Sequence, residues 1–315
     1  MKELVKSPLN YTGGKFKELP QLLELFPKDI DVFVDLFGGG GNVSVNVECN
    51  KVIYNDSMWQ VSKMLQTFKT RDKEDLLDNI EKIIGSYGLS NFERSSKSDL
   101  QSEFKRSSKS ELHSEFNRES YLKLRYDYNA LLYRGRFNPV MLYTLCCYAF
   151  NNQIRFNKDG EFNMPFGKRS FNPSLKKRFC KFVDRLHEID IQFLSCDFTD
   201  VDLELGKNGF VYCDPPYLIT TASYNENGGW NESKEKELYE YLDDLNSRGI
   251  RFGMTNMLSM SDKENVMLKE WMDKYRVEEL DSYHGNCNYQ KSKKKKNSRE
   301  VYVCNYPDTF LHKID

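Results

Sequence analysis

The segment Asp214-Pro215-Pro216-Tyr217 places a carboxylate, two prolines and an aromatic ring next to one another. An apolar run at 210–213 precedes it, which is typical of a buried strand that ends at Asp214. Each proline fixes a φ angle and removes a backbone donor, so the segment offers oxygens without competing N–H groups. Such a site suits a planar molecule with an exocyclic amine, because the amine donates two hydrogens and the Tyr217 ring can stack on the plane. A strand-to-loop turn with an incidental tyrosine is the alternative interpretation.

A second strand pattern, residues 32–37, runs into four consecutive glycines at 38–41. With a helix-like segment at 43–47, it is typical of the opening of a nucleotide-binding α/β unit, since glycine permits a tight turn and close approach of a ligand to the backbone. No Gly-Lys-Ser/Thr sequence follows the glycines, which argues against a phosphate-binding P-loop. Asp35, at the strand tip, is expected to face a cationic amino group such as that of a methionine moiety.

The next strand pattern, at 51–54, ends in Asn55-Asp56. This places Asp56 about twenty residues after Asp35, where an acid can accept both hydroxyls of a ribose. The same residue can instead cap a helix that begins near Ser57, and the two roles are compatible.

Together these motifs resemble the Dam-type DNA adenine-N6 methyltransferases, the D12 class or α group of amino methyltransferases. Residues 8–15 are similar to that family's opening motif, and residues 152–167 resemble its DNA-reading β-hairpin. The resemblance covers nearly the whole chain. It implies an α/β fold with a Rossmann-like, mostly parallel sheet that binds S-adenosylmethionine, interrupted by a mostly helical target-recognition domain that carries the hairpin.

The resemblance also implies roles for individual residues. Those implied to hold S-adenosylmethionine are Tyr11, Gly14, Lys15, Asp35, Phe37, Gly38, Gly40, Asp56, Asp197 and Phe198. The implied catalytic residues, which would bind the target adenine, are Asp214, Pro215, Pro216 and Tyr217. Residues expected to contact DNA are Arg155, Asn157, Lys158 and Asn163 of the hairpin, and Lys293, Lys294 and Lys295 of a basic run. That basic run is equally compatible with a solvated surface.

The implied reaction is methyl transfer to adenine N6 in double-stranded DNA, with the base flipped out of the helix and no metal needed. A GATC-like recognition sequence and a role in a restriction-modification system are implied by the family resemblance alone. Amino methylation of RNA adenine or of protein glutamine, and a catalytically silent DNA-binding regulator, are the competing hypotheses. Expected partners are double-stranded DNA and a cognate restriction endonuclease acting beside the enzyme without a stable complex.

The 315 residues, 39% of them hydrophobic, are enough for a core domain with a large insertion. We expect a catalytic domain over 1–57 and 171–315, and a recognition domain over 58–170. Within the latter, residues 94–117 are a tandem duplication rich in Ser, Lys and Glu. This composition predicts a mobile or marginally helical surface insertion without a catalytic role.

Other patterns predict further elements. Strands are expected at 191–194, 251–256 and 301–304, the last in a terminal hairpin, and a helix is expected to open at 258–262. The segment 220–230 is expected to be a loop that closes over the target base. Tyrosines interleaved with basic residues between 121 and 136 suit a DNA-facing surface, although at least half of them are expected to pack in an ordinary amphipathic helix.

Composition limits the function classes. The formal net charge of −1 carries no global basic signal, so contacts to DNA must come from local clusters. Eight scattered cysteines and four histidines predict neither a disulfide framework nor a zinc site. No signal region and no apolar stretch of about 20 residues is recognisable. A cytoplasmic monomer without a membrane segment is the expectation.

Overall fold

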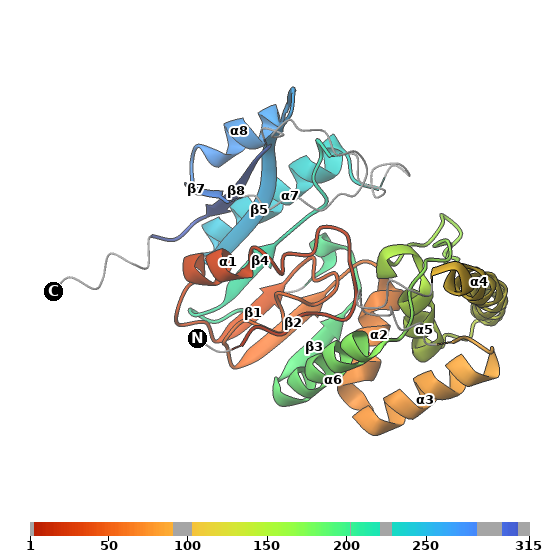
Figure 1. Ribbon diagram of the computed structural model, residues 1–315. Coiled ribbons are helices and arrows are strands. Elements are labelled where there is room, and N and C mark those ends of the chain that lie inside the picture. The colour runs from red at the N-terminus through yellow and green to blue at the C-terminus, as the bar shows by residue number, and fades with distance from the viewer. Residues whose placement is uncertain (1–2, 91–102, 202, 221–228, 282–297, 308–315) are drawn as a thin grey trace. The chain divides into compact units, whose positions relative to one another are not determined.

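The computed structural model describes residues 3–90, 103–201, 203–220, 229–281 and 298–307, with side chains left out of the description at 103–116 (Figure 1). The chain divides into two units. One comprises Met1–Thr12 with Lys63–Glu188, and the other comprises Gly13–Ser62 with Ile189–Asp315. The segment 171–188 groups with the first, mainly helical unit. The assignment of catalysis and DNA recognition to separate domains stays a prediction.

The second unit contains a mostly parallel sheet, which confirms the predicted mixed α/β class. Its path is β3-β2-β1-β4-β5-β8-β7, with β6 paired to β5. The strands are β1 Val32–Asp35, β2 Lys51–Asn55, β3 Ile191–Leu194, β4 Phe210–Cys213, β5 Arg251–Met260, β6 Lys263–Glu264, β7 Arg276–Leu280 and β8 Ser298–Cys304. The strands β3, β2, β1, β4 and β5 pair in parallel, whereas β8 is antiparallel to both β5 and β7. The predicted terminal hairpin is therefore present.

The centre of the sheet brings two of the predicted motifs together. β1 pairs with β4 in the register that places Asp35 opposite Tyr212, so Asp35 and Asp214 leave the sheet at the same edge. All four residues of β4 are buried, as expected for a parallel strand covered on both faces. Because the chain passes from β1 to β2 on one side and β4 lies on the other, this edge is a topological switch point, where open α/β sheets bind ligands.

Three helices of this unit are α1 Leu19–Leu25, α7 Glu232–Ser247 and α8 Val266–Met272. On α7, Leu238, Leu242 and Leu245 recur at helical spacing and are fully buried in the core that includes β4 and β5. The side chains of Asn231 and Asn265 accept backbone N–H bonds and cap α7 and α8.

Two predictions of helices were wrong. The segment 43–47 forms successive turns, with backbone bonds from the N–H of Val45 to Gly41 and from that of Val47 to Val43, and not a continuous helix. The segment 258–262 does not open a helix either. There β5 continues past a register shift between Met257 and Ser259 as far as Met260, and α8 begins only at Val266 after its Asn265 cap.

The first unit contains helices in the region predicted to be helical, together with α6, which lies beyond that region. They are α3 Lys73–Ser86, α4 Glu103–Tyr133, α5 Pro139–Tyr148 and α6 Pro173–Glu188, with α2 Trp59–Thr70 entering the unit at Lys63. Residues 140–148 of α5 are all buried, so it is a core helix. On α4, Tyr121 and Tyr128 are buried whereas Tyr126 and Tyr133 are exposed, so the tyrosines divide between packing and surface. α4 includes the whole second copy of the duplication, residues 106–117, and most of the first copy lies outside the described residues.

No helix in the described ranges is long and apolar enough to cross a membrane. Among the same residues, no group of three or more His, Cys, Asp or Glu side chains is placed to hold a metal ion.

Candidate active site

Asp214 follows β4 directly, and its carboxylate accepts three side-chain hydrogen bonds on one oxygen. Oδ1 lies 2.9 Å from Lys15 Nζ, 3.0 Å from the Tyr217 hydroxyl and 2.7 Å from Thr255 Oγ1. None of the described residues donates to Oδ2. The carboxylate is therefore held by one oxygen and can accept a donor from a ligand on the other.

Lys15 lies between two carboxylates. Its ammonium, on a side chain only 6% exposed, is 3.4 Å from Glu300 Oε1 in addition to its contact with Asp214, and it donates to the carbonyl of Gly13. It also lies 4.9 Å from the centre of the Tyr217 ring. Burial by itself would lower the pKa of Lys15, but the two carboxylates outweigh this effect and raise it. The ammonium therefore stays charged.

Burial raises the pKa of the Asp214 carboxyl above its ordinary value. Lys15 and the hydrogen bond from Thr255 oppose this effect, and the nearby Glu300 adds to it. The single hydroxyl hydrogen of Tyr217 is shared between Asp214 Oδ1 and Glu300 Oε1, which lies 2.6 Å from the hydroxyl oxygen. Four residues from three separate parts of the sequence thus form one cluster, Lys15, Asp214, Tyr217 and Glu300, which we call the acidic cluster.

The Gly-rich loop lies at the neighbouring strand end. Asp35, which is 1% exposed, accepts from the backbone N–H of Ser44 at 3.1 Å and from its hydroxyl at 2.5 Å, both on Oδ2. Burial raises the pKa of Asp35 to about 7, and the Ser44 bonds reduce the rise. A cationic amino group beside this carboxylate would favour its ionised form.

Gly38 has a steric reason to be glycine. A Cβ at this position would overlap the ring of Tyr54, whose hydroxyl donates to the carbonyl of Gly39 over 2.6 Å. Gly39 itself has a φ of +49°. Tyr54 thus packs against Gly38 and holds the carbonyl of Gly39 in place.

Asp56 stabilises the same loop. Its Oδ2 accepts from the backbone N–H of Gly39 and its Oδ1 from that of Met58, each at 2.8 Å. Burial raises the pKa of Asp56 to about 6 despite these two bonds. A carboxylate oxygen has room for a second donor, so these contacts are compatible with the predicted binding of ribose hydroxyls.

Three aromatic rings gather beside the loop. The Phe37 ring centre lies 5.5 Å from that of Phe198 and 5.6 Å from that of Trp230, and Phe198 and Trp230 are 6.0 Å apart. Next to them, Asp197 accepts from Thr199 and from Lys234. Although burial opposes it, these donors hold the pKa of Asp197 below its ordinary value. The group suits a flat ring with polar edges.

A buried carboxylate holds this aromatic group in place. Glu235, fully buried on α7, accepts from Trp230 Nε1 at 2.6 Å on Oε2. On Oε1 it accepts from Tyr239 at 2.6 Å, Asn256 at 2.8 Å and Asn265 at 3.1 Å. Four neutral donors offset the burial of the carboxylate. This network therefore ties Trp230 to α7, β5 and the cap of α8.

The remaining predicted cofactor residues are less constrained. Gly40 is buried in the loop and Gly14 is exposed next to Lys15. Tyr11 is half-buried and belongs to the first unit, so the structure does not place it relative to the acidic cluster. Pro215 and Pro216 follow Asp214 without secondary structure, buried and half-buried respectively.

The predicted hairpin, in the first unit, has the expected turn. Asn157 N–H donates to the Glu161 carbonyl at 2.9 Å, Gly160 has a φ of +79°, and Phe156 bridges Phe162. The side chain of Asn157 accepts from the backbone at 159 and 161 and so builds the turn itself. Lys158 lies exposed at the tip.

The base of the hairpin is also linked internally. Arg155 Nε donates to Asn163 Oδ1 over 2.8 Å, and the guanidinium also donates to the Asn163 carbonyl at 3.1 Å. Lys293, Lys294 and Lys295, and most of the predicted closing loop, lie outside the described residues.

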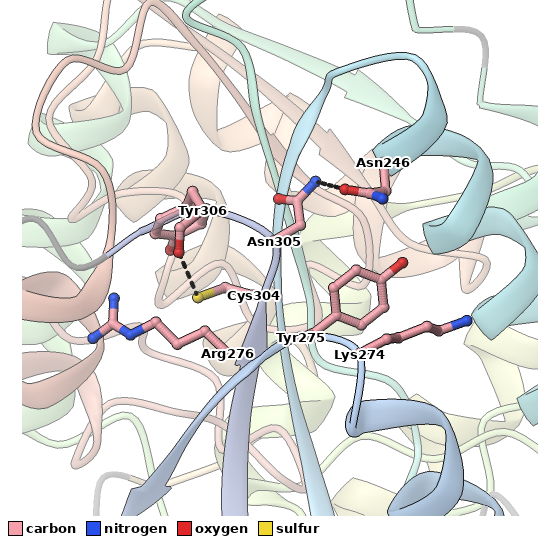
Figure 2. Close-up of a pocket in the computed structure, with 7 residues that line it drawn as sticks. All are labelled: Asn246, Lys274, Tyr275, Arg276, Cys304, Asn305 and Tyr306. Atoms are coloured by element: carbon pink, nitrogen blue, oxygen red, sulfur yellow. Dashed lines mark hydrogen bonds between the residues drawn. The ribbon is translucent and has the colours of Figure 1, made fainter.

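A small surface pocket of the second unit lies elsewhere. It is lined by Asn246, Lys274, Tyr275, Arg276, Cys304, Asn305 and Tyr306 (Figure 2). Because α7 ends and β7 begins here, and Cys304 pairs with Gly253 early in β5, the pocket lies toward the amino ends of the parallel strands. None of the predicted site residues lines it.

Sequence reasoning missed four residues that define the site: Thr255, Glu300, Trp230 and Glu235. Glu300 had a recognisable signal, since it is an acid immediately before the apolar strand run 301–304. Glu235 had none, because it stands among charged residues at the start of an amphipathic helix.

The fold and site define a class. A mostly parallel sheet with a Gly-rich loop and an Asp-Pro-Pro-Tyr segment at adjacent strand ends is consistent with an S-adenosylmethionine-dependent methyltransferase fold. Residues 11–286 match the model of the D12 class N6 adenine-specific DNA methyltransferases, and the chain belongs to this family.

Curated relatives agree with this assignment. The chain is 40% identical over 96% of its length to the type II methyltransferase M.FokI of Planomicrobium okeanokoites, and 37% identical over 97% to the modification methylase StsI of Streptococcus sanguinis. It spans 43% of each of these two relatives. A DNA adenine methylase of Salmonella typhimurium is 24% identical, with 84% of this chain and 82% of that protein covered.

Proposed function

We propose that this chain transfers a methyl group from S-adenosylmethionine to the N6 amine of adenine in double-stranded DNA. The observation that carries the proposal is the Asp214 carboxylate, which is held through Oδ1 while Oδ2 receives no bond from the described residues. An amine that donates to Oδ2 would lie beside Tyr217 and at the strand edge next to the Gly-rich loop. Family membership supports the same reaction.

The residues present suit the cofactor. Asp35 offers a carboxylate to a cationic amino group, Asp56 has spare acceptor capacity for ribose hydroxyls, and the Phe37–Phe198–Trp230 group offers apolar faces to an adenine. When bound there, S-adenosylmethionine would supply a methyl group activated by its sulfonium. Lys15 was expected to bind the cofactor, but its contact with Asp214 favours a role beside that carboxylate.

Adenine N6 is a poor nucleophile because its lone pair is delocalised into the ring. Asp214 Oδ2 and the Pro215 carbonyl would draw the two amine hydrogens toward acceptors, which favours tetrahedral geometry at nitrogen. Positioning of this kind supplies about 7–11 kcal/mol in good cases. The base must leave the duplex to reach this edge, at a cost of a few kcal/mol that stacking on Tyr217 offsets in part.

The biological setting is proposed from the relatives. Two relatives are named modification methylases and a third is named a type II methyltransferase. These names support a role in a restriction-modification system, with a cognate endonuclease that acts on the same sequence. A GATC-like site is the first sequence to examine. The first unit, with its hairpin, is the proposed DNA-recognition part.

The test is methyl transfer from labelled S-adenosylmethionine to unmethylated genomic DNA, followed by mapping of modified bases by sequencing. We expect N6-methyladenine at one short motif, and none with Asp214→Ala. Asp243→Asn is the matched control, because Asp243 is a carboxylate bonded by Trp271, Lys274 and Tyr275 away from the site.

Three outcomes would contradict the proposal. Cofactor binding without transfer to DNA, together with transfer to RNA or protein glutamine, would identify a different amino methyltransferase. Tight DNA binding without any transfer would favour a silent regulator. Full activity of Asp214→Ala would remove Asp214 from the reaction.

A further inference from the structure

We propose that Thr255 is a positioning residue for methyl transfer, which fixes the orientation of the Asp214 carboxylate through a hydroxyl relay that begins at Tyr212. In this relay the hydroxyl of Tyr212 donates to Thr255 Oγ1, and the hydroxyl of Thr255 donates to Asp214 Oδ1. The inference rests on the proposed adenine methylation and adds two residues to it. Both residues would act through Asp214.

The register of the sheet places the three residues side by side. β4 and β5 are parallel neighbours, and Cys213 at the end of β4 lies opposite Met254. Asp214 and Thr255 come next on their two chain segments, so they lie beside each other at the edge where Asp214 leaves the sheet. Tyr212, two residues before Asp214, faces the same side of the sheet. The relay is therefore built on strands.

The direction of the two hydrogen bonds follows from the number of hydrogens. Thr255 has one hydroxyl hydrogen, and its Oγ1 lies 2.7 Å from Asp214 Oδ1 and 3.5 Å from the carbonyl oxygen of Cys213. The carboxylate is the closer and the charged acceptor, so the hydrogen goes to Asp214. Tyr212, whose hydroxyl lies 3.0 Å from Thr255 Oγ1, then donates its own hydrogen to that oxygen. Hydrogen bonds joined in this way strengthen one another.

The hydroxyl at position 255 requires an explanation other than packing. Thr255 and Tyr212 are fully buried, and β5 on either side of Thr255 is buried as well. Burying a hydroxyl costs free energy unless it is hydrogen-bonded, and valine has nearly the same shape without that cost. Valine would therefore serve at this position if packing alone mattered. The contact with Asp214 explains the hydroxyl.

Thr255 is the donor to Asp214 with the most fixed geometry. Lys15 carries its ammonium on a flexible stem and divides its hydrogens between Asp214 and Glu300. Tyr217 shares its one hydrogen between the same two carboxylates, and its shorter contact, 2.6 Å, is to Glu300. Thr255 is β-branched and stands in a strand, so its χ1 angle is restricted. Its hydroxyl therefore defines where Oδ1 lies.

This orientation matters because an aspartate carboxylate rotates easily. The torsion about the Cβ–Cγ bond of Asp has broad energy minima, so bonds from other residues must set it. The Asp214 side chain is 15% exposed, so a ligand can reach the carboxylate. With Oδ1 held by Thr255, Oδ2 would keep the direction in which it accepts a hydrogen of the amine. A misplacement of about 1 Å can cost about 100-fold in rate.

The first experiment measures kcat of wild type, Thr255→Val and Thr255→Ser, with S-adenosylmethionine and duplex DNA that contains the mapped site. We expect kcat to fall about tenfold or more in Thr255→Val, with unchanged affinities for cofactor and DNA. Thr255→Ser keeps the hydroxyl and should recover most of the loss. Thr144→Val is the control expected to behave as wild type, because Thr144 is an equally buried threonine of α5 that donates to the carbonyl of Val140.

The pH dependence gives a readout that a loss of packing would not move. The hydrogen bond from Thr255 lowers the pKa of Asp214, so Thr255→Val should raise that pKa and shift the acid limb of the kcat profile to higher pH. Thr255→Ser should keep the wild-type limb. The ionisable groups that act on Asp214 are unchanged in both variants; they include Lys15, Asp35, Tyr212, Cys213, Tyr217 and Glu300.

A second set of measurements tests the relay itself. Carbon-13 NMR of carboxyl-labelled aspartate, with Asp214→Asn to assign the signal, should show a raised Asp214 pKa in Thr255→Val without turnover. Tyr212→Phe removes only the outer donor, so it should change the same pKa and kcat in the same direction by less. It also remains informative if Thr255→Val folds poorly. Because Tyr212 acts through Thr255, the double variant Tyr212→Phe/Thr255→Val should be no slower than Thr255→Val.

The outcomes separate the two proposals. A folded Thr255→Val with wild-type kcat and an unmoved Asp214 pKa would overturn the role of Thr255, and so would a Thr255→Ser variant as slow as Thr255→Val. Effects of Tyr212→Phe and Thr255→Val that add in full would overturn the relay from Tyr212. A wild-type protein that binds the cofactor and methylates no adenine would overturn the proposed function and this inference with it.

Discussion

Lys15 Nζ lies 2.9 Å from Asp214 Oδ1, which joins residues 199 positions apart in the sequence into one buried ion pair. The opening motif thus contacts the Asp-Pro-Pro-Tyr motif directly. This finding changes the experiment that best tests Lys15.

Replacing Lys15 by Met should act on the chemistry more than on cofactor binding. Loss of the ammonium removes the main group that lowers the pKa of Asp214, so the acid limb of the kcat profile should move to higher pH. Cofactor affinity, measured by isothermal titration calorimetry, should stay close to that of Lys17→Met, an exposed control. A large loss of cofactor affinity with an unmoved pH profile would return Lys15 to the predicted cofactor role.

Cofactor binding should depend on pH through Asp35. Its pKa of about 7 in the free protein must fall when a cationic amino group binds, so affinity should rise with pH up to about pH 7, by at most about tenfold per unit. Calorimetry between pH 5.5 and 8 tests this expectation, and Asp35→Asn should flatten the curve. An equally steep curve in Asp35→Asn would assign the effect to another group, such as Asp56.

The raised pKa of Asp35 also affects the free energy of unfolding, which should fall with rising pH where cofactor affinity rises. Because the pKa of Asp35 is raised on folding, the folded state binds more protons than the unfolded state between about pH 4 and pH 7. The contribution of Asp35 therefore favours folding at low pH and is lost as pH rises through 7. Urea denaturation at pH 5 and pH 8 measures this loss as a difference in the free energy of unfolding. In Asp35→Asn the contribution of residue 35 to that difference should be absent.

Glu235→Gln should weaken both the fold and the cofactor site. Exchanging one carboxylate oxygen for an NH2 group opposes at least one of its four donors, which should lower the free energy of unfolding by about 2–3 kcal/mol. Trp230 should loosen, which would change its fluorescence and reduce cofactor affinity. Trp230→Phe identifies the signal, and Glu237→Gln, on the same helix and partly exposed, is the control. Unchanged fluorescence and affinity would limit Glu235 to a structural role.

Gly38→Ala should displace the Gly-rich loop. The added methyl group overlaps the Tyr54 ring, so we expect a loss of about 1–3 kcal/mol in stability together with weaker cofactor binding. Tyr54→Leu in the same chain should recover part of the stability by making room. If the double variant is no more stable than Gly38→Ala, the contact with Tyr54 is not the reason for glycine.

Substitutions at two adjacent hairpin residues, Asn157 and Lys158, should affect DNA binding in different ways. Lys158→Ala should weaken binding to all DNA sequences and reduce the salt slope of log Kd by about one, as expected for a phosphate contact. Asn157→Ala removes the acceptor that closes the turn and should reduce discrimination between sequences. Lys177→Ala, exposed on α6, is the charge control. Equal effects of Lys158→Ala and Lys177→Ala on the slope would make Lys158 an ordinary surface lysine.

Much of the fold could be predicted from local sequence patterns. Runs at 32–35, 51–54, 191–194 and 210–213 are short, apolar and bounded by turn residues, so their extended structure follows from local pattern and burial. The segment 43–47 and the extension of β5 were mispredicted. In the second case, the pairing of β5 with β8 as far as Met260 outweighed local preference.

The sequence by itself determined the class of protein, because the Gly-rich loop, the acid that follows it and Asp-Pro-Pro-Tyr are contiguous motifs with chemistry visible in their residue types. Only the tertiary structure decided that Lys15 and Glu300 meet at Asp214 and that Glu235 holds Trp230. The physical reason is that Lys15, Asp214 and Glu300, and likewise Glu235 with its donors Asn256 and Asn265, come from distant segments. Which donor reaches which carboxylate depends on strand order and register, which no local pattern specifies.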